Sequence, residues 1–197
     1  MSEREDLELL ESWRDGDQRA GTELFGRHFD ALYRFFRSKL EHQAEDLVQL
    51  TFLACVRNRE TFRGDSSFRS YLYCVARSKL YDALRKRARG TDVSMCTMAD
   101  LRASPSSWLA RKSELQLVQV ALEQLPLELQ LAVELFYFEE LSAREVAEAL
   151  DIPEGTVRSR LRRALDDLRG NIEKLAATDE QAQKTLEGLD HLVGSER

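Results

Sequence analysis

The sequence predicts an all-α protein made of two small helical domains joined by a flexible linker. Only three prolines and nine glycines occur in 197 residues, and apolar residues recur at the three- and four-residue spacing of helices. Residues 90–112 lose this periodicity and are rich in serine, as linkers are. We therefore expect domains at 1–89 and 113–170, a helix-turn-helix in the second domain, and an extension at 171–197.

Composition and motifs exclude several classes of protein. No apolar run approaches the ~18 residues of a membrane span, and the acidic start MSEREDLELL lacks the pattern of a secretory signal. We therefore expect a cytoplasmic location and no membrane insertion. Cys55, Cys74 and Cys96 form no C-x-x-C pair, so we expect no metal site and no cofactor. The absence of paired carboxylates, a nucleophile–base set or a glycine-rich phosphate loop argues against an enzyme.

Helical spacing predicts two helices within residues 7–40, and a break at Gly16 and Asp17 separates them. Residues 44–58 form the next predicted helix. Its expected apolar residues are Leu47, Leu50, Leu53 and Ala54.

A tight loop at residues 62–67 leads into a long predicted helix at 68–89. Aromatic residues follow the loop, and we expect Phe68 and Leu72 to be buried. The net charge of the chain is −6, but residues 77–89 hold six basic residues against one acid. The total therefore conceals a local basic surface of the kind that binds nucleic acid.

Two further helices are predicted at 113–125 and 127–138, on either side of Pro126. We expect them to pack under the motif that follows through Leu115, Val118, Leu122, Leu125, Leu131, Leu135, Phe136 and Phe138. Ser142 and Glu145 then have the S-x-x-E spacing of a capping box, which starts another helix.

A break after the capped helix, followed by a second helix, predicts a helix-turn-helix. Asp151–Pro153 ends the capped helix, because proline cannot continue it. The apolar face of the second helix consists of Val157, Leu161, Ala164, Leu165 and Leu168. At roughly 100° per residue, Ser159, Arg162 and Arg163 then point away from the core. Arg158 lies at the edge of that outward face.

Outward arginines on such a helix suit a DNA major groove, because they donate to the O6 and N7 atoms of guanine. The ordinary alternative is a solvated helix face with ion pairs. The candidate pairs are Arg160 with Glu154, and Arg162 or Arg163 with Asp166 or Asp167. The capped preceding helix, the short break and the apolar register favour DNA binding.

Three blocks of sequence resemble one protein family. They are AEDLVQLTFLACVRN, FRGDSSFRSYLYCVARSKLYDALRKRAR and LPLELQLAVELFYFEELSAREVAEALDIPEGTVRSRLRRALDDLR. Together they resemble a bacterial RNA polymerase sigma factor of the extracytoplasmic-function (ECF) group. The resemblance covers roughly residues 7–170. It implies that the first domain binds core RNA polymerase and opens the minus-ten element of promoter DNA, and that the second reads the minus-thirty-five element.

The resemblance also implies roles for individual residues. Asp46 and Gln49, one turn apart, would meet the polymerase clamp. A second set of residues, which we call the minus-ten set, would contact the minus-ten element through a loop that captures a base, aromatic stacking and phosphate contacts. This set consists of Phe62, Arg63, Gly64, Asp65, Ser66, Ser67, Tyr71, Arg77, Ser78, Lys79, Arg85 and Lys86. The minus-thirty-five set consists of Thr156, Arg158, Ser159, Arg162 and Arg163.

Two positions depart from the family pattern. Ser78 stands where many members carry Asn, and Tyr71 stands where they carry Trp. Because the serine has no amide group, the base preference of the family at the minus-ten element does not carry over to this chain.

Some alternatives remain open at this point. The acidic extension 171–197 is interpreted as disordered, as a packing helix, or as a tail over the recognition face, and we expect it to be dispensable for the fold. A repressor with its own sensor domain would leave the helix at 44–58 and the loop at 62–67 unexplained. A protein that binds an anti-sigma factor without initiating transcription is a further alternative, and an anti-sigma factor is a possible partner in either case.

Overall fold

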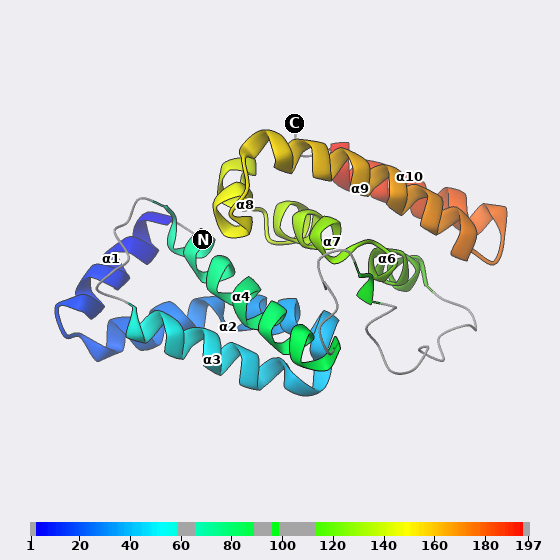
Figure 1. The fold of residues 1–197 in the computed structure, drawn as a ribbon. Helices are drawn as coiled ribbons and strands as arrows, with labels where there is room; N and C mark the ends of the chain where they lie inside the picture. Colours follow the sequence, from blue (N-terminus) through cyan, green and yellow to red (C-terminus); the bar gives the residue numbers. More distant parts are fainter. Residues whose placement is uncertain (1–2, 59–65, 89–95, 99–112, 195–197) are drawn as a thin grey trace. The chain divides into compact units, whose positions relative to one another are not determined.

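The computed structural model describes residues 3–58, 66–88, 96–98 and 113–194, and every regular element in these ranges is a helix (Figure 1). The α-helices are α1 (Glu3–Arg14), α2 (Gln18–Leu40), α3 (Ala44–Arg57), α4 (Phe68–Ala88), α6 (Glu114–Glu123), α7 (Leu127–Val133), α8 (Ala143–Leu150), α9 (Glu154–Leu175) and α10 (Asp179–Gly194). A short 3-10 helix (Glu41–Gln43) precedes α3, and a π-helical turn (Glu134–Phe138) follows α7. The all-α prediction is confirmed.

The chain forms two compact units. One comprises Met1–Ala83 with Leu141–Glu154, and the other comprises Leu84–Glu140 with Gly155–Arg197. Apart from residues 96–98, the predicted linker at 90–112 lies outside the described residues. The boundaries expected at residues 89 and 113 stay predictions.

The break between α1 and α2 arises as the sequence predicts. Gly16 has φ +106°, a left-handed conformation that glycine adopts without steric cost. Asp17 then caps α2, because its Oδ1 accepts from the backbone N–H of Arg19 at 2.8 Å. The two helices pack against each other through Leu10 and Trp13 on α1, which are buried.

The apolar stripe expected on α3 is partly wrong. The buried face of α3 consists of Ala44, Leu47, Val48, Thr51 and Cys55. Leu50 and Leu53 are 49% and 51% exposed. Two apolar stripes are possible on this helix, and packing against the neighbouring helices selects the one that contains Val48 and Cys55.

On α4, Phe68 and Leu72 are buried as expected. The same helix also buries Tyr73 and Ala76 in the first unit. The basic residues of its second half therefore extend from a helix whose start is anchored in the core.

In the second unit, Ser113 and Gln116 form a capping box at the start of α6. This helix buries Leu117 and Ala121, but Leu115 is 84% exposed, contrary to expectation. Phe138, the last residue of the π-helical turn, is also exposed, contrary to expectation.

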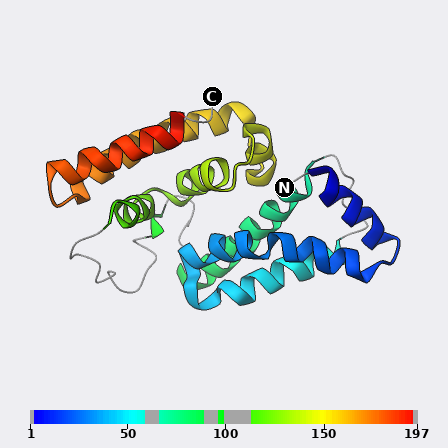
Figure 2. The same ribbon diagram turned by 180° about the vertical axis from the view of Figure 1, so that it is seen from behind.

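The C-terminal extension is a packed helix in its described part. Helices α9 and α10 form an antiparallel hairpin in this unit (Figures 1 and 2), and α10 also contacts α6. Ile172 at the end of α9 and Leu189 on α10 are buried. The side-chain amide of Asn171 donates to the carbonyl of Ala121 at 3.2 Å. This packing argues against the expectation that residues 171–197 are dispensable for the fold, which stays a prediction until the truncated chain is measured.

Candidate nucleic-acid and polymerase interface

The helix-turn-helix begins with the predicted capping box. The Ser142 hydroxyl accepts from the backbone N–H of Glu145, and the Glu145 carboxylate accepts from the backbone N–H of Ser142 at 2.9 Å. Helix α8 ends at Asp151, whose left-handed φ of +51° turns the chain. Pro153 directly precedes Glu154, the first residue of α9, and so lies just outside the first turn in which it was expected.

Helix α9 presents two distinct faces. Val157, Leu161 and Ala164 are buried. The side chains on the opposite side are exposed, and they are Arg158, Ser159, Arg162 and Arg163. Thr156 is half-buried. An exposed set of hydrogen-bond donors backed by an apolar face is the arrangement that a major-groove helix requires.

Of the ion pairs expected on α9 from the sequence, that between Arg163 and Asp167 is present, whereas Arg160 has a different partner. Arg160 pairs with Glu128 on α7, where Nη2 and Oε2 lie 2.6 Å apart, rather than with Glu154. Arg163 Nε lies 3.8 Å from Asp167 on the exposed surface. A surface pair of this length restrains the arginine weakly.

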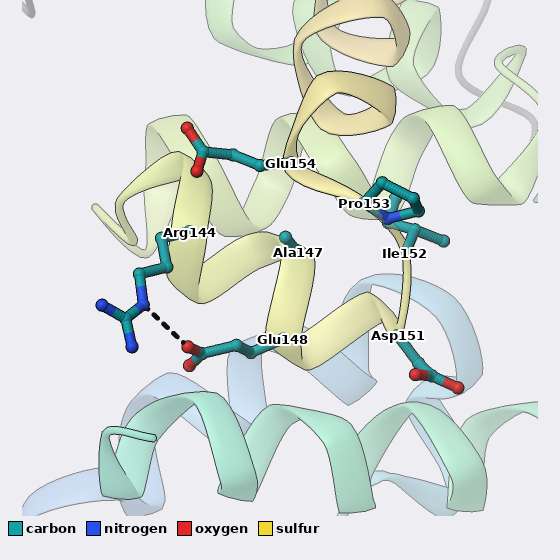
Figure 3. Close-up of a pocket in the computed structure, with 7 residues that line it drawn as sticks. All are labelled: Arg144, Ala147, Glu148, Asp151, Ile152, Pro153 and Glu154. Atoms are coloured by element: carbon teal, nitrogen blue, oxygen red, sulfur yellow. Dashed lines mark hydrogen bonds and ion pairs between the residues drawn. The ribbon is translucent and has the colours of Figure 1, made fainter. Parts of the chain in front are cut away.

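A shallow hollow lies at the turn between α8 and α9 (Figure 3). Arg144 and Glu148 project together from α8 beside it and form an ion pair at 3.1 Å, and Ile152, Pro153 and Glu154 complete the rim. The Arg144 side chain is 75% exposed. It adds a cation near the start of the motif that the sequence reasoning did not include.

On α3, Asp46 and Gln49 are both exposed. Leu50 and Leu53 are exposed on the same side, because positions 46, 49, 50 and 53 follow the spacing of one helix face. Adjacent exposed leucines beside polar groups are typical of protein-binding surfaces. The sequence reasoning missed these two residues because it assigned them to the core.

The minus-ten set is only partly described. Phe62, Arg63, Gly64 and Asp65 lie outside the described residues. Ser66 is half-buried and Ser67 is buried. The Ser67 hydroxyl donates to Oε1 of Glu145 at 2.8 Å within the first unit.

The remaining minus-ten residues lie along α4. The Arg77 guanidinium donates to the carbonyl of Leu150. Tyr71, Ser78 and Arg85 occur at seven-residue intervals, which places them on one side of the helix. Ser78 and Arg85 are exposed and Tyr71 is half-buried.

Burial of Tyr71 raises the pKa of its phenol to about 12. The ring is therefore uncharged at neutral pH. Lys79 is half-buried and Lys86 is exposed, so these two cations also extend the basic surface of α4.

Neither a metal-binding cluster nor a membrane-spanning helix occurs in the part of the chain that the structure describes. No cluster of three or more potential metal ligands occurs among the described residues. None of the described helices is both long and apolar enough to cross a membrane.

Comparison with known proteins supplies the family. Residues 24–90 match the model of sigma-70 region 2, and residues 115–168 match that of sigma-70 region 4. The chain is 30% identical to the RNA polymerase sigma-H factor of Pseudomonas aeruginosa, over 83% of this chain and 92% of that protein. The chain belongs to the ECF RNA polymerase sigma factors.

Further relatives agree with this assignment. The sigma factor is 33% identical to the ECF RNA polymerase sigma factor SigM of Mycobacterium tuberculosis, over 82% of each chain. Its fold is similar to that of CnrH in complex with the cytosolic domain of CnrY, with a TM-score of 0.68 and 25% identity over 87% of this chain and 99% of the other. It is also similar to the sigma factor RpoE of Bartonella quintana in complex with the anti-sigma factor NepR, with a TM-score of 0.57 and 25% identity over 73% of this chain and 91% of the other.

Family membership confirms several predictions made from the sequence. This sigma factor directs transcription initiation through RNA polymerase, binds core polymerase and promoter DNA, and is a non-catalytic subunit. The matched regions end at residue 168, so α10 lies beyond both of them.

Proposed function

We propose that this sigma factor reads two promoter elements with two separate domains, at residues 1–89 and 113–170. The observation that carries the proposal is the division of α9 into a buried face at Val157 and Leu161 and an exposed basic face at Arg158 and Arg162. The exposed face enters the major groove of the minus-thirty-five element, where the arginines contact guanine edges or phosphates. Ser159, Thr156 and Arg163 complete this contact.

The minus-ten element is opened by the first domain. The loop from Phe62 to Ser67 receives an unstacked base, and Tyr71 and Ser78 on α4 contribute to the same DNA contact. Arg77, Lys79, Arg85 and Lys86 hold the phosphates of the separated strand. Because Ser78 stands where many family members carry an amide, their base preference does not carry over to this chain.

The polymerase contact is made by α3. Asp46 and Gln49 supply polar contacts, and Leu50 and Leu53 supply apolar area next to them. A mixed face of this kind provides both affinity and a defined orientation. Burial of the leucines adds apolar contact, and the carboxylate and the amide fix how the two proteins are oriented.

The sigma factor works in the cytoplasm, where core polymerase is found. An anti-sigma factor is its regulatory partner. Two similar structures support this step, because they contain CnrH with the cytosolic domain of CnrY and the Bartonella RpoE with the anti-sigma factor NepR. Such a partner would act by covering surfaces that polymerase or promoter DNA requires.

Reconstitution with core RNA polymerase tests the proposal. Wild-type protein is expected to give transcripts from a promoter selected with this holoenzyme, and substitutions in either promoter element should abolish them. Asp46→Lys and Leu53→Asp should each weaken core binding in a pull-down while helicity by circular dichroism is retained. Asp30→Lys is the charge-matched control, because Asp30 is exposed on α2 and lies outside α3. Normal core binding by both test variants would reject α3 as the polymerase contact.

Replacing Arg63–Ser67 with a glycine-serine segment tests the minus-ten assignment separately. The holoenzyme should still contact the minus-thirty-five element but should fail to open the promoter. Permanganate footprinting detects unpaired thymines in the open complex. Unchanged thymine reactivity would remove the loop from the proposed mechanism.

A further inference from the structure

One arginine of α9 is held differently from the arginines around it. Arg160 Nη2 lies 2.6 Å from Glu128 Oε2, and the two side chains are 23% and 22% exposed. Arg162 and Arg163 are exposed. Arg160 lies at the margin of the buried face, because it is three residues after Val157 and four before Ala164. Its guanidinium therefore reaches sideways to another helix of the same unit instead of outward.

Glu128 belongs to a firmly packed part of that unit. It lies in the first turn of α7, where the helix dipole stabilises a carboxylate. Its neighbours Leu127 and Leu129 are buried. The backbone N–H of Leu127 also donates to the carbonyl of Cys96 at 3.0 Å. The ion pair thus connects α9 to α7, a helix that is itself packed in the core of the unit.

The apolar contacts of α9 define its rotation less sharply than a directional hydrogen bond does. Hydrophobic burial is non-directional, so a small rotation of α9 about its axis keeps Val157 and Leu161 in contact with the core. A short, charge-assisted hydrogen bond is directional and strong. It lies on one flank of the helix, where it resists rotation in a way that contacts along the centre of the buried face do not.

We propose that the Arg160–Glu128 ion pair is a positioning element that sets the rotation of the recognition helix and thereby its base preference. The inference rests on the proposed function of α9 in reading the minus-thirty-five element. Recognition groups must be held within ~0.5 Å and ~10–20° of their productive geometry. Arg160 is a positioning residue that touches no DNA itself, and it acts through Arg158 and Arg162.

The test uses reconstituted holoenzymes on promoters that differ by single base pairs in the minus-thirty-five element. The variants are Glu128→Gln, Arg160→Gln and the charge swap Glu128→Arg with Arg160→Glu. Wild-type holoenzyme is expected to discriminate by ~5- to 150-fold per substituted base pair, which corresponds to ~1–3 kcal/mol. Glu128→Gln and Arg160→Gln should each lower the discrimination at one or more positions by about fivefold, the loss of one base contact. The charge swap should restore most of it.

Asp190→Asn is the matched control. It removes the 2.9 Å ion pair between Asp190 on α10 and Arg169 on α9, which involves the same helix beyond the recognition face. Its promoter preference should equal that of the wild type. The Tm of each variant, measured by circular dichroism, separates loss of folding from loss of specificity.

Three outcomes distinguish the possibilities. If both single variants keep wild-type discrimination and only their Tm falls, the ion pair is purely structural and the proposal is wrong. If discrimination changes only in Arg160→Gln, and the salt dependence of binding falls by about one unit, Arg160 contacts a phosphate and the proposal is also wrong. If the wild-type holoenzyme itself shows no preference at the minus-thirty-five element, the proposed function fails instead, whatever the variants do.

Discussion

The indole ring of Trp13 on α1 lies directly over Gly21 on α2. A Cβ atom added at Gly21 would be 2.6 Å from Cδ1 and from Nε1 of Trp13, which is closer than real contacts allow. Trp13 is buried and also meets the edge of Phe25 at a centroid distance of 5.2 Å. The missing side chain at Gly21 therefore permits α1 and α2 to approach each other.

Gly21→Ala is expected to lower the free energy of unfolding by ~1–3 kcal/mol, the usual cost of overpacking. Gly26→Ala on the same helix is the control, because nothing lies within 4 Å of a Cβ at that position. The control should be neutral or more stable by up to ~1 kcal/mol, from helix propensity. Urea unfolding measures both. Equal stability of the two variants would contradict the close contact with Trp13.

The Glu145 carboxylate predicts a pH-dependent contribution to stability. Partial burial alone would raise its pKa, but hydrogen bonds from Ser142 and Ser67 outweigh burial and lower the pKa below the ordinary 4.5. The folded state therefore favours the carboxylate, and its contribution is present above pH ~4.5 and is lost as the pH falls through the folded-state pKa.

Glu145→Gln should destabilise the protein by ~1 kcal/mol at pH 7. The difference in the free energy of unfolding between this variant and the wild type should shrink as the pH falls from 6 towards 3, and urea unfolding at each pH measures it. Glu148→Gln, which only removes a surface pair with Arg144, should give a smaller difference. A difference for Glu145→Gln that is constant across this pH range would argue against the charged cap.

Cys55 predicts slow thiol chemistry. Burial raises the pKa of its thiol to about 12, and the thiolate is the reactive form. In the folded protein at pH 8, Cys55 should therefore resist alkylation, whereas Cys74 and Cys96, which are half-exposed, should react first. Peptide mass spectrometry after iodoacetamide treatment measures the order, and rapid labelling of Cys55 without unfolding would show that its site is open.

Arg163→Ala separates base reading from phosphate binding on α9. If Arg163 makes a two-point contact with guanine, the variant should lose ~1–3 kcal/mol at one base pair of the minus-thirty-five element. If it meets only phosphate, affinity should fall evenly and the salt slope should shrink by about one unit. Lys174→Ala is the control, because Lys174 is exposed near the far end of the same helix.

Parallel Ala variants of Arg158 and Arg162 complete the comparison on the same promoters. If all three arginine variants lost affinity equally for every promoter, α9 would bind only the DNA phosphate backbone, and base reading by this helix would be rejected.

Truncation after Gly170 should destabilise the second unit. It removes Ile172, which is fully buried, together with Asn171 and all of α10. Loss of one large buried aliphatic side chain alone costs ~2–5 kcal/mol. The measurement is thermal unfolding of the full and truncated chains. An unchanged Tm would restore the view that the extension is dispensable for the fold.

Local patterns allowed much of the fold to be predicted. The capping box of Ser142 and Glu145 and the break at Gly16 depend on neighbouring residues, so spacing alone reveals them. Ser113 and Gln116 carry a related capping pattern, and the same rule could have located the start of α6.

Features set by packing were harder to predict. Both Leu50 and Val48 fit helical spacing on α3, and only the surrounding helices decide that Val48 is buried and Leu50 is exposed. Likewise, Glu154 is near Arg160 in sequence, but this separation does not place the two side chains on one helix face. The observed partner, Glu128, is 32 residues away in sequence. Contacts between distant segments require the tertiary structure.

The contact between α10 and α6 also means that the second unit cannot complete its fold until the end of the chain has been synthesised. A ribosome completes the arginines of α9 before it makes the helix that covers α6. Until α10 emerges, a nascent chain carries all of its DNA-reading side chains on an unfinished core. A premature stop within α10 would release such a chain permanently, and its exposed apolar surface would mark it for aggregation or proteolysis rather than for assembly with polymerase.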